Sequence, residues 1–118
     1  MQNLKAMAFN AEGQATAAGV FEFDVPVGIT ILGVSLCVEA YSGSGSTCNI
    51  DVQDDTTDVI TAVTADTAGT PGTWYTPALG GSETPVTIAA GSDVEIDLNL
   101  DSDTADFTVI LYFVFNEV

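Results

Sequence analysis

The sequence contains no histidine and one basic residue, Lys5, against 17 aspartates and glutamates. The 118-residue chain therefore carries a formal net charge of -16. Nucleic-acid binding requires Lys and Arg side chains that displace counterions from phosphates, and one lysine cannot supply them. Attachment to anionic lipid is disfavoured for the same reason. We expect neither a nucleic-acid partner nor a membrane partner.

The lack of histidine and the single lysine also argue against catalysis, because the usual general bases and nucleophile activators are missing. Paired carboxylates could hydrolyse a glycoside, but they must face each other across a cleft, for which a domain this small has little room. We expect no enzyme.

Long apolar runs are also missing. The longest, residues 107–115, has the length of a strand, and the N-terminus lacks the apolar core of a secretory signal. We therefore expect synthesis in a cytoplasm.

Cysteine is scarce as well: Cys37 and Cys48 flank the stretch SGSGS at residues 42–46, which is typical of a hairpin loop. Alternation places Cys37 on the polar side of its strand, whereas Cys48 shares the apolar side with Ile50. In a paired hairpin the two thiols would then lie on opposite faces of the sheet. The pattern favours two free thiols, although a bulge would permit a disulfide.

Period-two alternation of apolar and polar residues recurs along the chain, and no helical period appears. Turn-forming segments rich in Gly, Pro, Asp and Ser separate the strands. The expected strands are residues 21–25, 29–41, 47–53, 58–64, 73–76, 85–88, 94–100 and 107–115. They predict an all-β, antiparallel β-sandwich of seven to eight strands. A jelly roll is favoured because the Cys…Trp…Cys pattern of an immunoglobulin domain is missing. Residues 15–118 form one domain, preceded by an arm at 1–14.

An acidic row, VEIDLNLDSD, occupies residues 94–103. Residues 97–103 begin like a calcium loop, but an EF-hand needs Gly at its sixth position and Glu at its twelfth. Those positions hold Ser102 and Thr108. The row predicts a solvated outer face, which also discourages sheets from stacking on one another.

The turn QDDTTD at residues 53–58 is the other candidate for a cation. Asp54, Asp55 and Asp58 could converge on calcium, although Asp and Thr are also ordinary turn formers. We expect no other cofactor.

Two apolar features predict contacts with a partner. The strand at 107–115 is apolar on both sides, because Ile110, Tyr112 and Val114 lie opposite the core-facing residues. Such a strand is either central and covered on both faces or buried between subunits. Trp74 and Tyr75 lie in a Gly- and Pro-rich stretch, where aromatic rings could anchor a protein, stack on a sugar or plug the end of the sandwich.

The segments VPVGITILGVSLCVEAY, NIDVQDD, TPGTWYT and LGGSETPVTIAAGSDVEIDLNLD together resemble small all-β virion proteins of tailed bacteriophages, notably capsid decoration proteins. The resemblance implies a structural protein on the outer surface of the virion. It also implies a major capsid protein as partner, a homotrimer, and an N-terminal arm that hooks onto the shell. The residues expected to make contacts are Leu4, Lys5, Met7, Phe9, Trp74, Tyr75, Ile110, Tyr112 and Val114.

Two other hypotheses remain open. The chain could be a carbohydrate- or receptor-binding β-sandwich module of a phage tail or a cell surface, acting through Trp74 and Tyr75. It could also be an acidic β-domain from a salt-loving organism. The first of these predicts that a Trp74→Ala substitution abolishes glycan binding.

Overall fold

A computed structural model describes residues 3–45, 47–66, 71–75 and 85–116. The segments predicted as turns between the expected strands at 58–64, 73–76 and 85–88 fall largely outside these residues. The described part contains nine strands and no helix that is long and apolar enough to cross a membrane. The strands are β1 (Lys5–Gln14), β2 (Ala17–Asp24), β3 (Ile29–Ser42), β4 (Thr47–Asp54), β5 (Thr57–Asp66), β6 (Trp74–Tyr75), β7 (Val86–Ile88), β8 (Asp93–Leu100) and β9 (Thr104–Phe115).

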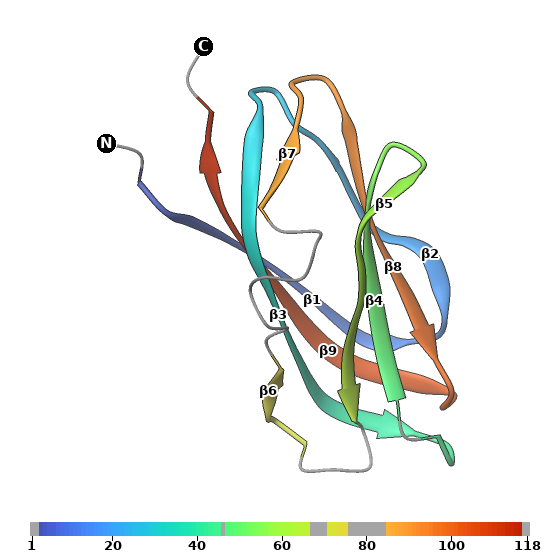
Figure 1. The fold of residues 1–118 in the computed structure, drawn as a ribbon. Coiled ribbons are helices and arrows are strands. Elements are labelled where there is room, and N and C mark those ends of the chain that lie inside the picture. The colour runs from blue at the N-terminus through green and yellow to red at the C-terminus, as the bar shows by residue number, and fades with distance from the viewer. Residues whose placement is uncertain (1–2, 46, 67–70, 76–84, 117–118) are drawn as a thin grey trace.

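The strands form two antiparallel sheets that pack as a sandwich (Figure 1). Sheet A has the order β1-β9-β3-β6, with β7 also paired to β3, and sheet B has the order β2-β8-β4-β5. Both β6 and β7 pair with β3 on the same edge, so they occupy one strand position. The result is the strand order of a jelly roll, in which successive strands cross between the sheets except at the β4–β5 hairpin and at β6 and β7, which share one position. The predicted fold class is confirmed.

The core lies between the sheets and is filled by alternate residues of each long strand. In β8, Val94, Ile96 and Leu98 are buried, whereas the residues between them are only partly covered. Because successive side chains of a strand point to opposite faces, one face packs inward and the other contacts solvent. The acidic row therefore lies on the outer face of sheet B, as predicted.

The position of β9 explains its two apolar faces. It lies in the middle of sheet A, paired with β1 on one side and with β3 on the other. Phe107, Val109 and Leu111 are buried against sheet B, and the alternate residues are half-buried on the outside. The strand is therefore central in its sheet, as predicted, but only one of its faces is covered, and burial of the other face between subunits stays a prediction.

The N-terminal segment is a strand and not an arm. Residues 5–14 pair antiparallel with β9 along their length, with a bulge near Gly13. Met7 and Phe9 pack against the core, and the Phe9 ring lies 5.0 Å from that of Phe21 and 5.5 Å from that of Phe23. The expectation of an arm over residues 1–14 was wrong for residues 5–14, because these two side chains close one end of the core.

The SGSGS stretch does not form a hairpin, because β3 belongs to sheet A and β4 to sheet B. The link passes close to the β8–β9 turn. A Cβ atom on Gly45 would overlap the backbone carbonyl of Asp101, and Gly43 has a φ of 97°. Glycine fits here because it has no side chain and accepts positive φ.

Both cysteines are free and buried, as predicted, but for a different reason. Cys37 lies in sheet A and Cys48 in sheet B, so they belong to different sheets. Burial raises the pKa of the Cys48 thiol to about 12, and burial with the nearby Glu39 carboxylate raises that of Cys37. Neither thiol is activated as a nucleophile.

Candidate functional site

The two outer faces of the sandwich differ sharply in charge. Alternate residues of β2, β4 and β8 bring carboxylates to the outer face of sheet B, which we call the acidic face. Its carboxylates are those of Glu22, Asp24, Asp51, Asp93, Glu95 and Asp97. Their regular spacing follows from the period of two residues that a strand imposes.

Several of these acids lie directly opposite one another. The pairs across β2 and β8 are Glu22 with Glu95 and Asp24 with Asp93. Asp51 of β4 similarly faces Asp97 of β8. Like charges directly opposite in an antiparallel pair destabilise the sheet. Desolvation, together with hydrogen bonds and charges from Glu22 and Asp24, raises the pKa of Asp93 to about 6.

Within the described residues, one trio of acidic side chains has the spacing of a metal site. Oxygens of Glu22, Asp93 and Glu95 lie within 4.8 Å of one another. At one ligand oxygen from each carboxylate, the trio supplies three ligands, whereas calcium takes six to eight. The trio shows where the repulsion is concentrated.

Two acids of the turn predicted as a calcium site form hydrogen bonds within the protein. Asp55 accepts a hydrogen bond from the Asp93 backbone amide at 3.0 Å, and its own amide donates to the Asp93 carbonyl at 2.7 Å. The Asp58 carboxylate accepts from the Gln53 side-chain amide at 2.8 Å. Asp54 has one buried carboxylate oxygen without a hydrogen-bond partner. Two of the three predicted ligands therefore fasten the β4–β5 turn.

Among the described residues, the outer face of sheet A carries no charged side chain over most of its length, and we call it the uncharged face. Its central row, from β9, is flanked by small residues of β1 and β3, and Trp74 lies beside Cys37 at its edge. The residues of this face are Ala6, Ala8, Asn10, Thr30, Ser35, Cys37, Trp74, Thr87, Thr108, Ile110, Tyr112 and Val114.

The predicted contact residues divide into three groups. Ile110, Tyr112 and Val114 lie half-buried on the uncharged face, and Trp74 joins them there with half of its surface exposed. Met7, Phe9 and Tyr75 point to the other side of sheet A and pack against the core. Leu4 and Lys5 are exposed where β1 begins.

Exposed large apolar side chains are associated with sheet A. Among the described residues, Leu32, Trp74 and Phe115 lie on its strands, Leu4 immediately precedes β1, and Val27 lies in the turn that leads into β3. The acidic face carries none of those five. Of these five, only Trp74 belongs to the uncharged face as defined above, and the other large apolar groups of that face are the half-buried Ile110, Tyr112 and Val114.

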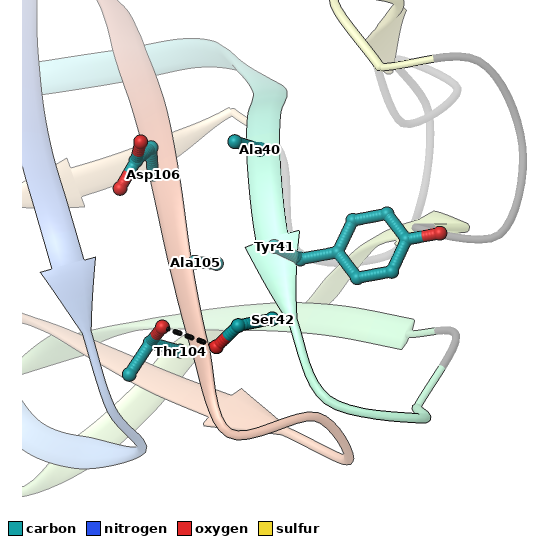
Figure 2. Close-up of a pocket in the computed structure, with 6 residues that line it drawn as sticks. All are labelled: Ala40, Tyr41, Ser42, Thr104, Ala105 and Asp106. Carbon is teal, nitrogen blue, oxygen red and sulfur yellow. Dashed lines mark hydrogen bonds between the residues drawn. The ribbon is translucent and has the colours of Figure 1, made fainter.

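The hollow in Figure 2 lies where β3 ends and β9 begins. It has a volume of about 190 Å³, and Ser42 and Thr104 share a hydrogen bond of 2.7 Å beside it. Small-molecule sites have volumes of about 300–1,000 Å³, so this hollow is too small for a drug-sized ligand. Its lining residues are Ala40, Tyr41, Ser42, Thr104, Ala105 and Asp106.

Sequence reasoning missed the contribution of β1 to the uncharged face. Ala6, Ala8 and Asn10 flank the β9 row, and Asn10 donates a hydrogen bond of 2.7 Å to the Thr108 hydroxyl. The available signal was the alternation of these small residues with Met7 and Phe9, which is a strand pattern.

Comparison with solved structures relates the fold to chains of phage capsids. A chain in the capsid asymmetric unit of cyanophage Pam1 matches with a TM-score of 0.61 and 18% identity, covering 98% of this chain and 86% of that one. A chain in the acidic stable capsid structure of Helicobacter pylori bacteriophage KHP30 matches with a TM-score of 0.57 and 14% identity, covering 98% of this chain and 89% of the other. No family model matches the sequence, and no curated protein matches it.

Proposed function

We propose that this protein is a structural virion protein that decorates and stabilises the outside of a bacteriophage capsid. The observation that carries the proposal is the match, over nearly the full length, to chains of similar size in two phage capsid structures. The action is mechanical: the protein clamps neighbouring shell subunits and resists the pressure of packaged DNA. Neither an activated thiol nor a pocket of ligand size is needed for this role.

The distribution of charge supports an outer location. The acidic face keeps a decorated particle soluble, because its carboxylates repel those of other particles. Inside a DNA-filled head the same carboxylates would meet closely packed phosphates. The proposal therefore turns the acidic face of sheet B toward solvent.

The partners in this proposal are the major capsid protein and two further copies of the chain, which form a homotrimer. Leu4 is 62% exposed and adjoins Lys5, the single basic residue, at the start of β1. This end also holds the exposed Phe115, whose strand β9 pairs with β1. We assign the shell contact to this end.

The sugar-binding alternative has weaker support. A carbohydrate platform commonly presents more than one aromatic surface, yet Tyr75 packs against the core and leaves Trp74 as the exposed ring of the pair. The hypothesis then depends on Trp74 alone, and a Trp74→Ala variant that retained all glycan binding would eliminate it.

The proposal is tested by adding the purified protein to shells that lack it. The protein should sediment with the shells at a saturable, fixed ratio and raise the temperature at which they release DNA. Leu4→Asp should weaken this binding, because it places a charge in the shell contact, whereas Ser44→Asp in the exposed β3–β4 link should not. Protein that stays in the supernatant at saturating concentration would contradict the proposal.

A further inference from the structure

We infer that copies of this chain meet through the uncharged face of sheet A, with Ile110, Tyr112 and Trp74 at the contact. This inference rests on the proposed function for the number of copies and on the structure for the surface. It assigns the face to a second copy of the same chain and leaves the end near Leu4 for the shell.

Charge makes this the favourable face for self-association. Sheets of a sandwich are spaced by about 10 Å, so two copies stacked through their uncharged faces would hold their acidic faces about 30 Å apart, and three copies that turn these faces toward a threefold axis point their acidic faces outward, away from one another. That separation exceeds the Debye length of about 8 Å at physiological ionic strength, and the repulsion is screened. Contact through the acidic faces would instead bring opposing carboxylates within one sheet spacing.

The shape of the face also suits a copy of itself. Tyr112 and Ile110 form the central row of the face. Their neighbours on β1, Ala6 and Ala8, are small and exposed, whereas Gly33 and Ser35 on β3 are already buried within the chain. The larger side chains of one copy can therefore lie over Ala6 and Ala8 of the next. Around a threefold axis each face would touch both neighbours, with the β9 row nearest the axis.

An acidic end makes the association of parallel copies dependent on salt. Glu12, Glu39 and Asp106 lie where the uncharged face ends, toward the β3–β4 link. Glu39 accepts a hydrogen bond from Thr108 at 3.0 Å, and Asp106 accepts one from the Gly13 amide at 2.6 Å. Copies arranged in parallel around an axis keep these ends together, so added salt should favour association.

The test compares two variants that add the same charge to opposite faces. Ala8 and Asn99 are both exposed on strands, Ala8 beside Ile110 on the uncharged face and Asn99 on the outer side of β8. The solution masses of the wild type, Ala8→Glu and Asn99→Glu are measured by light scattering over a concentration series in 0.5 M NaCl. Circular dichroism and thermal melts establish that each variant is folded.

The wild type should have three times the 12.2 kDa chain mass, and so should Asn99→Glu. Ala8→Glu should be a folded monomer, with a dissociation constant raised about tenfold or more by like charges at the contact. An Ala8→Glu variant that assembles like the wild type, or a wild type that is monomeric at every concentration, would overturn the inference. A stable dimer sensitive to Ala8→Glu would support this face and contradict the trimer.

The shell assay separates this inference from the proposed function. If the wild type binds shells and Ala8→Glu assembles as the wild type does, only the assignment of this face as the contact between copies is wrong. Assembly that depends on Ala8 without any shell binding would support the face and remove the decoration role.

Discussion

At the scale of single residues, neighbouring carboxylates of the acidic face repel one another. Asp93 lies opposite Asp24 and within hydrogen-bonding reach of Glu22, and its pKa is raised to about 6. A carboxyl whose pKa is higher in the folded state binds more protons when folded than when unfolded between these two pKa values. Its contribution to stability therefore falls as the pH rises from about 4 to above 6.

Replacing Asp93 with Asn should raise the melting temperature at pH 7, because the amide has no charge to repel Glu22 and Asp24. The gain should shrink as the pH is lowered to 4.5, where the wild-type carboxyl is itself protonated. Thermal melts of both proteins between pH 4.5 and pH 7.5 measure this difference.

Glu12→Gln is the matched control, since it removes one charge from an exposed position of β1, at the acidic end of sheet A and away from the acidic face. It should change the melting temperature less than Asp93→Asn does at pH 7. Equal shifts for the two variants at every pH would show that net charge matters and the local cluster does not.

At the scale of strands, β1 contributes side chains both to the core and to the uncharged face. Its inward residues Met7 and Phe9 pack against the core, and its outward residues Ala6 and Ala8 flank the β9 row. Removing β1 would expose an edge of β9 and one side of the Phe21 ring. The strand therefore contributes to stability as well as to the proposed contact.

Phe9→Ala should lower the free energy of unfolding by about 2 kcal/mol, less than the ~3–5 kcal/mol of a fully buried phenylalanine because Phe9 is half-buried. Denaturant unfolding measures the loss. Leu4→Ala, which truncates an exposed residue of the same segment, should change stability by less than about 0.5 kcal/mol. An unaffected Phe9→Ala protein would mean that residues 5–14 behave as an arm.

The strands that could be predicted are those in which the order of apolar and polar residues shows which side chains are buried. Alternation in β8 and the two-sided apolar pattern of β9 indicated their places directly. β1 was missed because Ala6 and Ala8 carry little hydrophobic signal, and its role depends on Phe21 and Phe23, which are distant in sequence.

The link between β3 and β4 shows a second limit, because a Ser/Gly stretch fits a hairpin and a crossover equally well. The choice depends on which sheet each strand joins, and that is set by long-range pairing. Ile110, Tyr112, Val114 and Trp74 were predicted from sequence to make contacts, and the structure places them on the uncharged face, so their role in contacts stays a prediction. The inward direction of Tyr75 depends on its register against Leu36, which the sequence does not reveal.

At the scale of the whole molecule, the sandwich places charge on one outer face and the proposed contact surface on the other. It is an elongated body of 48 × 23 × 23 Å with an acidic face on one sheet and an uncharged face on the other. A net charge of -16 opposes self-association, so contact requires a face from which charge is missing. The jelly roll provides that face, because its two sheets have independent outer surfaces.

The most direct test is a cryo-electron microscopy reconstruction of shells saturated with this protein. We expect added density on the outer surface, with three copies around each occupied axis. The sheet A faces should turn toward that axis and the sheet B faces toward solvent. Density inside the shell, or outer density in which the acidic face of sheet B lies against protein, would contradict the account.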